Sequence, residues 1–168
     1  MEIRLATMDN LQAVKEMYRQ IVYHMNEQNI SIWDEVYPCE FLEEDIKNSQ
    51  LYLLVEKENI VSAFALCQTN AGEKAVKWEN DNAKAVYIDR FAVCVTYLKR
   101  GIGSITLEKA KEIAKTMGAE YLRLFVVDMN IPAISLYEKQ GFVKAKGIYY
   151  EKIDEDLILQ EYGYEIRL

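Results

Sequence analysis

Several residue types are scarce in this sequence, and each scarcity excludes a class of protein. Only two prolines and seven glycines occur among 168 residues, and no tract is compositionally biased, so we expect an ordered chain. The three cysteines, Cys39, Cys67 and Cys94, are far apart and odd in number. They therefore predict neither a disulfide framework nor a zinc site, and no other cluster has metal-ligand spacing. A reducing, cytoplasmic location and no bound metal are the expectation.

Long apolar runs and positive charge are also missing. No segment is long and apolar enough to span a bilayer, and the opening MEIRLATMDN carries charges where a signal peptide has an apolar core. The formal net charge is −7 with no basic block, which argues against nucleic acid or an anionic membrane as a partner. The same balance favours a cationic substrate. The lone histidine, His24, is expected to be structural.

The residues that are plentiful are apolar. They make up 51% of the sequence, enough for one continuous core, so we expect one domain over residues 1–168. Hydrophobic periodicity predicts, in chain order, a strand at 3–5, a helix from Asp9 or Asn10 to 21, a helix with Pro38 in its first turn, a hairpin of strands 51–55 and 60–67, and a polar loop at 70–82.

The second half alternates strands and helices. The patterns predict a strand at 86–95, a helix that ends at Gly118, a strand at 121–127, a helix at 130–140 that ends before Gly141, and strands at 142–150 and 157–166. A strand-helix-strand order predicts a parallel crossover within a mixed sheet. The fold class is therefore α/β.

Two glycines, Gly101 and Gly103, follow Lys99 and Arg100 and come directly before a predicted helix. The first amides of a helix lack intrahelical partners and attract an anion, and glycines let a phosphate approach the backbone. Two glycines also suit a tight strand-to-helix turn, so this feature alone is a weak signal. A dinucleotide fingerprint is excluded because Thr106 stands where its third glycine would be, and a Walker loop is absent.

A second motif follows the loop. Residues 130–142 read NIPAISLYEKQGF. With the glycine turn, this stretch resembles the GCN5-related N-acetyltransferase (GNAT) family, whose motifs are [RQ]-x-x-G-x-[GA] and N-x-x-A-x-x-x-Y-x-x-x-G-[FY]. The resemblance covers residues 88–142 and departs at Leu98, where the family favours Arg or Gln. It implies a mixed central sheet of about seven strands, with two splayed central parallel strands, flanked by about four helices.

The resemblance also implies a reaction, the direct transfer of an acetyl group from acetyl-CoA to a primary amine in a ternary complex. Tyr137 takes the family position of the general acid that protonates the departing CoA thiolate. The residues that the resemblance assigns to acetyl-CoA are Phe91, Ala92 and Val93 for the thioester arm, Lys99, Arg100, Gly101, Ile102, Gly103 and Ser104 for the pyrophosphate, and Asn130 and Ala133 on the following helix. The family's pyrophosphate contacts are mostly main-chain amides, so the change at Leu98 is expected to be tolerated, with Lys99 and Arg100 supplying charge; its effect on CoA affinity is open.

The base that deprotonates the acceptor is less well defined. On the strand at 86–95, Tyr87, Asp89 and Phe91 share one parity, so Asp89 is the carboxylate that can face the cleft. Some family members place a glutamate on the next strand, where this chain has Phe125. Asp89 is therefore the candidate base or ammonium anchor. The alternatives are a salt bridge in the surroundings of Arg90 and a base made only of water.

The acceptor itself is a small-molecule or peptide amine, and its identity is open. Trp33 and Tyr37 lie in IWDEVYP, which resembles a W-x-x-x-Y-P stretch of one bacterial branch of the family. Both are candidate acceptor-binding residues, and core packing explains them equally well. Trp78 is either a homodimer contact or a residue packed under its own loop. A non-catalytic acyl-CoA-binding sensor or scaffold is the alternative function.

Overall fold

The structure, a computed structural model, describes all residues from Met1 to Leu168 and divides into two compact units. Unit 1 comprises Met1–Leu66 and Arg90–Lys109, and unit 2 comprises Cys67–Asp89 and Ala110–Leu168. The fold class is mixed α/β, as predicted, with mostly antiparallel strands, one parallel pair and four α-helices. The extent of a single domain over residues 1–168 stays a prediction.

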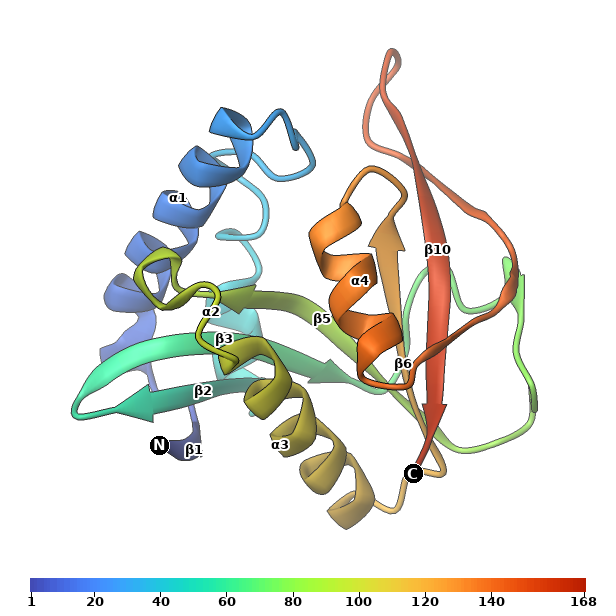
Figure 1. The fold of residues 1–168 in the computed structure, drawn as a ribbon, viewed down its shortest axis with the longest axis horizontal. Helices are drawn as coiled ribbons and strands as arrows, with labels where there is room; N and C mark the ends of the chain where they lie inside the picture. Colours follow the sequence, from blue (N-terminus) through green and yellow to red (C-terminus); the bar gives the residue numbers. More distant parts are fainter. The chain divides into compact units, whose positions relative to one another are not determined.

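Unit 1 is built on an antiparallel hairpin (Figure 1). Strand β2 (Leu51–Glu56) pairs with β1 (Glu2–Leu5) on one side and with β3 (Asn59–Cys67) on the other. Lys57 and Glu58 have φ values of +46° and +68°, which a two-residue turn between twisted strands requires. The predicted hairpin is therefore confirmed. The end of β5 (Ala85–Val93) continues the sheet beyond β3.

The first helix of unit 1 follows the predicted period. A short 3-10 turn (Met8–Asn10) leads into α1 (Leu11–Glu27), whose apolar face is buried at Val14, Met17, Tyr18, Ile21 and Val22. The Thr7 N–H donates to Asn10 Oδ1 at 2.9 Å, which satisfies a backbone donor ahead of the helix. This arrangement agrees with the predicted start at Asp9 or Asn10.

The second predicted helix starts later than expected. Helix α2 spans only Leu42–Lys47, so the expectation that Pro38 lies in its first turn is wrong. The Asp34 side chain instead accepts the N–H groups of Val36 and Tyr37, at 2.8 and 2.7 Å, which closes a turn just before the proline. Side-chain turns of this kind compete with helix formation, and a residue before proline disfavours the helical conformation.

Helix α3 (Ile102–Thr116) begins in unit 1 and ends in unit 2, following a 3-10 turn (Val95–Tyr97). Its start is packed into a cluster with Leu54 and Val61. Gly118, with a φ of +74°, lies just beyond its end, as predicted. The end of this helix is therefore confirmed, and Gly103, expected just before the helix, lies in its first turn.

Unit 2 contains the parallel pair. The register of β5 with β6 (Tyr121–Val127) runs from Ala85–Tyr121 to Ile88–Leu124. Strand β10 (Ile158–Arg167) is antiparallel to β6 and carries β7 (Val143–Lys144) and β9 (Tyr149–Lys152). In Figure 1 helix α4 (Ile131–Lys139) lies against β10, where Tyr164 Oη donates to Glu138 Oε1 at 2.8 Å.

Two expectations about unit 2 need correction. The predicted strand at 142–150 is broken into β7, β8 (Lys146–Gly147) and β9, and Gly147, within β8, has a φ of +106°. The predicted polar loop at 70–82 contains a short strand, β4 (Val76–Lys77), which pairs with β8. The loop is therefore tied to the rest of the unit.

The core of unit 2 explains Trp78. Its ring is 4% exposed and packs with Val76, Tyr87 and Ala145. A side chain at Gly163 would lie 2.9 Å from Trp78 Cη2, so the glycine leaves the space that the ring fills. Of the two readings of Trp78, the structure supports the one in which it packs under its own loop.

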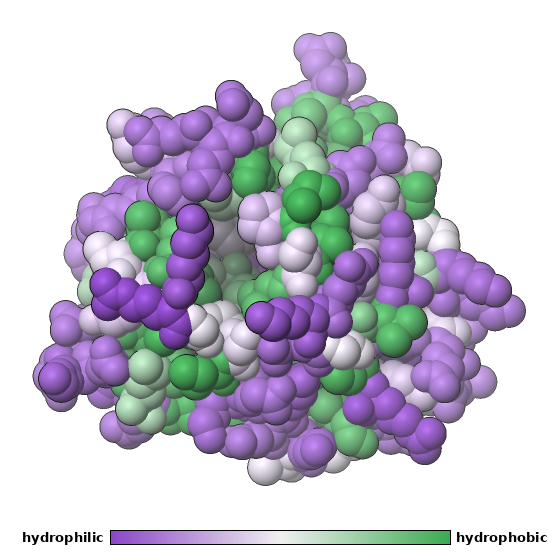
Figure 2. Space-filling view, in the orientation of Figure 1, coloured by the Kyte–Doolittle hydropathy of each residue, from purple (hydrophilic) through white to green (hydrophobic).

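The face in Figure 2 is largely hydrophilic, with hydrophobic side chains in separate patches. No helix combines the length and the apolar character that crossing a membrane demands.

Candidate functional site

The glycine turn of unit 1 has the geometry of an anion site. Lys99 and Gly101 have φ values of +60° and +77°, and the Ile105 N–H donates to Gly101 O at 3.1 Å at the start of α3. The amides of Ile102, Gly103 and Ser104 therefore occupy the first turn, at the positive end of a 15-residue helix.

The surroundings of this turn suit a phosphate. A Cβ built on Gly101 would meet no atom within 4 Å, so the space beside the turn is open and the positive φ is what requires glycine. Lys99 and Arg100 are both exposed, and the Arg100 guanidinium lies 5.4 Å from the centre of the Tyr97 ring. The turn therefore offers backbone amides and two cations without a side chain in the way.

Thr106, which stands where a dinucleotide fingerprint would have glycine, is fully buried. Its hydroxyl lies 2.6 Å from Ser62 Oγ on β3 and donates to Ile102 O at 2.8 Å. These bonds fix the first turn of α3 to the sheet of unit 1. Thr106 therefore has a structural role that the sequence motif did not reveal.

The predicted thioester-binding residues lie at the end of β5. Ala92 is buried, and Phe91 and Val93 are half-buried. Arg90, directly before them, has a φ of +53°, and the Cys94 N–H after them donates to Val61 O at 2.9 Å. The strand is therefore kinked at Arg90 and anchored again on β3. Nothing in the sequence predicts this kink, because arginine rarely adopts a positive φ.

The predicted acceptor-binding residues of unit 1 belong to a row of aromatic rings. Trp33 has its ring centre 5.7 Å from that of Tyr18 and 6.4 Å from that of Tyr37, and Tyr37 lies 5.6 Å from Phe41. Trp33 and Tyr37 are both half-buried. The structure thus brings the two candidates together. Their packing is also what a purely structural role in the core would produce.

In unit 2, helix α4 presents Asn130, Ala133 and Tyr137. Asn130 caps the helix by accepting the Ala133 N–H at 3.4 Å, and Gly141, with a φ of +87°, ends it. Tyr137 is 6% exposed, and its ring lies 5.9 Å from that of Phe142. Burial and the negative charge of Asp89 raise the pKa of Tyr137, so its phenol is protonated at neutral pH.

Asp89 is near two further groups that the sequence did not single out. Asn70 Nδ2 donates to Asp89 Oδ1 at 3.0 Å. On β10, burial, a hydrogen bond with Glu151 and the charges of Glu151 and Asp89 raise the pKa of Glu161 to about 9. Glu161 therefore holds a proton at neutral pH, and Asp89 lies within electrostatic reach of both Tyr137 and Glu161.

The register of β9 and β10 explains the carboxyl pair. Glu161 lies opposite Tyr149, and Glu151 lies opposite Leu159, so the two glutamates are diagonal neighbours on one face of the ladder. Alternation within each strand predicts which residues share a face. It does not predict which strands pair, and this is why the sequence missed both glutamates.

A hollow of about 590 Å³ also lies in unit 2, with Trp78, Tyr87 and Arg123 among its lining residues. Arg123 Nε donates to Glu165 Oε2 at 3.1 Å and Nη2 donates to Asn80 O at 2.8 Å. None of the predicted site residues lines it. The buried Arg123 side chain thus holds the 70–82 loop on the sheet.

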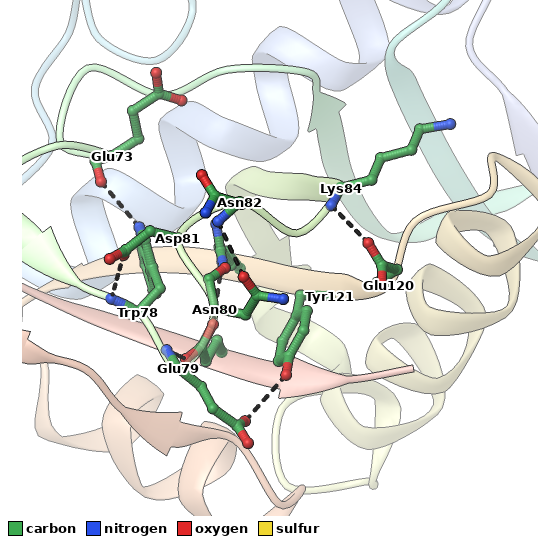
Figure 3. A network of polar contacts seen from close by, with 11 residues as sticks. Glu73, Trp78, Glu79, Asn80, Asp81, Asn82, Lys84, Glu120 and Tyr121 are labelled. Atoms are coloured by element: carbon green, nitrogen blue, oxygen red, sulfur yellow. Dashed lines mark hydrogen bonds and ion pairs between the residues drawn. The ribbon is translucent and has the colours of Figure 1, made fainter.

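The loop has its own polar network, shown in Figure 3. Trp78 donates from Nε1 to Glu73 O at 2.9 Å and from its main-chain N–H to Asp81 Oδ1 at 3.0 Å. Tyr121 Oη donates to Glu79 Oε2 at 3.2 Å. No group of three or more His, Cys, Asp or Glu side chains is placed to hold a metal ion.

Comparisons with known proteins agree with the geometry. The model of the Acetyltransferase (GNAT) family matches residues 8–142. The protein named "Putative phosphinothricin acetyltransferase YwnH" of Bacillus subtilis is 28% identical, over 86% of this chain and 85% of that protein. An N-alpha-acetyltransferase of Sulfolobus acidocaldarius is also 28% identical, over 94% and 89%. A GNAT-family acetyltransferase crystal structure from Streptococcus agalactiae superposes with a TM-score of 0.78 at 17% identity, covering 99% of this chain and 95% of that one.

Proposed function

Because the chain belongs to the acetyltransferase (GNAT) family and is an acetyl-CoA-dependent N-acetyltransferase, we propose that its acceptor is the primary amine of a small molecule or a peptide. The amine attacks directly, with Tyr137 as general acid and Asp89 as base or ammonium anchor. The observation that carries this assignment is the buried Tyr137 phenol, whose pKa is raised by burial and by the charge of Asp89. A phenol that is protonated at neutral pH can hydrogen-bond to the sulfur and donate its proton as negative charge builds there.

Acetyl-CoA supplies the acetyl group as an activated thioester. We assign its pyrophosphate to the open turn of Lys99–Ser104, where Gly101 leaves the backbone uncovered. Main-chain groups of Phe91–Val93 are assigned to the thioester arm, and Asn130 and Ala133 to the same co-substrate. Lys99 and Arg100 compensate for the loss of charge at Leu98.

The chain's own groups handle two protons. An amine with a pKa near 10 is almost wholly protonated at neutral pH, so Asp89, directly or through water, accepts one proton from the acceptor ammonium. The new bond joins the acceptor nitrogen to the acetyl carbon as the carbon–sulfur bond breaks. Tyr137 Oη gives its proton to the departing sulfur. The attacking nitrogen then loses its second proton, which returns through water to the Tyr137 phenolate, and Asp89 releases its proton to solvent. The products are an acetamide and a free thiol.

Trp33 and Tyr37 are proposed to line the acceptor's binding surface, where their rings offer a cation an aromatic face. The net charge of −7 favours a cationic acceptor. The names of the two relatives, an N-alpha-acetyltransferase and a phosphinothricin acetyltransferase, support a test panel of peptides with free N-termini and of phosphinothricin.

The test is release of free CoA thiol over this panel, with Tyr137→Phe as the variant. We expect turnover to fall about 100-fold or more, while the calorimetric Kd for acetyl-CoA stays unchanged, because the proton is given only in the transition state. Tyr23→Phe, at a residue 68% exposed, is the matched control. Equal losses of turnover and binding would contradict the acid role.

The alternative is a non-catalytic acyl-CoA-binding sensor or scaffold. It predicts that acetyl-CoA binds and that no amine on the panel releases thiol. Binding without release would therefore favour the alternative over the enzyme.

A further inference from the structure

Asn70 lies at the start of the 70–82 loop and makes two kinds of contact. Its Oδ1 accepts the Gly72 N–H at 2.9 Å, and its main-chain oxygen accepts the Glu73 N–H at 3.1 Å. These bonds close a turn in which the side-chain carbonyl replaces a backbone group. Nδ2 of the same Asn70 side chain donates to Asp89 Oδ1 at 3.0 Å.

The turn has little freedom to shift. Gly72 is buried, and a Cβ built on it would lie 2.8 Å from the Tyr149 ring and 2.9 Å from Phe125 Cε1. Those two rings pack edge to face with their centres 5.7 Å apart. The backbone next to Asn70 therefore packs directly against this aromatic pair.

The next part of the loop is held by further contacts. Trp78 Nε1 donates to Glu73 O, as Figure 3 shows. The Arg123 guanidinium lies 4.5 Å from the centre of the Trp78 ring. Arg123 in turn donates to Asn80 O at 2.8 Å. The loop thus presents the Asn70 amide to Asp89 from a defined position.

Asp89 has acidic neighbours. The titratable groups whose pKa the charge of Asp89 raises include Tyr137 on α4 and Glu161 on β10, and Glu161 is paired with Glu151 on β9. Neighbours of the same charge type disfavour ionisation of a carboxyl group, whereas a donated N–H favours it. The Asn70 amide donates such an N–H to this carboxylate.

We propose that Asn70 is a positioning residue for acetyl transfer: its amide holds Asp89 oriented and ionised, in the form that accepts or anchors the acceptor's ammonium. The inference rests on the proposed function, because it presupposes that role for Asp89. It adds a residue outside both sequence motifs, on a loop whose core tryptophan fixes its position.

Asn70→Asp separates the two contacts of the side chain. A carboxylate oxygen can still accept the Gly72 N–H, so the turn is kept, while the donor to Asp89 is replaced by a like charge. We expect the acid limb of the kcat/KM profile for the acceptor to move to higher pH by about one unit, with the Kd for acetyl-CoA changed less than twofold. Asn82→Asp, in the same loop and exposed, makes the same charge change and should leave the profile in place.

An Asn70→Asp profile that superposes on that of the parent protein would overturn the inference, because Asn70 would then serve the turn alone. If Asn70→Asp fails to fold by circular dichroism, Asn70→Ser is used, since its hydroxyl can close a similar turn but is too short to keep the donor in place. It should lower kcat/KM most at low pH, and a uniform loss at all pH values would also overturn the inference.

Asp89→Asn distinguishes this failure from failure of the proposed function. If Asp89→Asn removes the acid limb but Asn70→Asp does not move it, the role of Asp89 stands and the inference about Asn70 is wrong. If Asp89→Asn leaves the profile unchanged, both the proposed role of Asp89 and the inference about Asn70 are overturned. If the parent protein releases no thiol with any amine, the proposed function itself is wrong.

Discussion

Arg90 and Asp45 form a two-point ion pair inside unit 1. Arg90 Nε donates to Asp45 Oδ2 at 2.6 Å, and Nη2 donates to Oδ1 at 2.8 Å. The side chains are only 9% and 6% exposed, and the Arg90 oxygen also accepts the buried Tyr18 hydroxyl. Because Arg90 has a φ of +53°, this pair stabilises the kink in β5 immediately before the proposed thioester-binding residues.

We expect Asp45→Asn to destabilise the protein by about 3 kcal/mol, because it leaves a buried guanidinium without its neutralising carboxylate. Urea denaturation measures the change. Glu43→Gln is the control, since Glu43 pairs with Lys47 at 2.6 Å on the same helix but at the exposed surface. The control should leave the denaturation midpoint unchanged. A similar midpoint for Asp45→Asn and the parent protein would contradict the structural role of the pair.

The sequence predicted best those features that local signals define. Asn130 and Gly141 delimit α4 because a cap residue and a positive φ are properties of single positions. The apolar period of α1 and the two-residue turn at Lys57 and Glu58 are local in the same sense. Tyr137 was singled out because its spacing from these residues matched a family motif.

The remaining features depend on contacts between distant residues. Asn70 and Asp89 are 19 residues apart, and Asp45 and Arg90 are 45 apart. Nothing in the neighbourhood of Asn70 distinguishes it from the other polar residues of its loop. The breaks between β7, β8 and β9 likewise follow from the pairing of β8 with β4, which periodicity does not reveal.

Gly103→Glu should weaken acetyl-CoA binding at least tenfold in calorimetry. The substitution puts bulk and negative charge in the first turn of α3, where the pyrophosphate is proposed to lie, whereas a glutamate there is favourable for the helix itself. The fold should therefore be retained. Lys115→Gln makes the same change in net charge at the exposed last turn of α3 and should leave the Kd unchanged. Undiminished binding in Gly103→Glu would count against the placement.

Gly163→Ala should destabilise the protein by about 1–3 kcal/mol, because overpacking forces neighbours out of position. The new Cβ would lie 2.9 Å from Trp78 Cη2 and 3.1 Å from Val76 Cγ2. Thermal unfolding measures the loss, and Trp78 fluorescence in a Trp33→Phe background reports whether the ring moves. Gln160→Ala, exposed on the same strand, is the control. An unshifted melting temperature in Gly163→Ala would mean that the ring is held less tightly than its packing indicates.

The carboxyl pair of β9 and β10 makes stability depend on pH. Burial, followed by the contact with Glu151 and the charge of Asp89, raises the pKa of Glu161 from 4.5 to about 9. Between these values the folded protein binds more protons than the unfolded chain, so the free energy of unfolding falls as pH rises through the window. Glu161→Gln removes the titrating group and should flatten this dependence.

At pH 8 we expect Glu161→Gln to be more stable than the parent protein by on the order of 1 kcal/mol, and at pH 4 the two should be alike. Urea denaturation across pH 4 to 9 measures the difference. Glu155→Gln, at the exposed tip of the same hairpin, removes a carboxylate without this burial and should follow the parent curve. If Glu161→Gln followed the parent curve as well, Glu161 would be ionised in the folded protein at neutral pH. The ionised Glu161 would then repel the charge of Asp89. The ionised form of Asp89 would then depend even more on the hydrogen bond from Asn70.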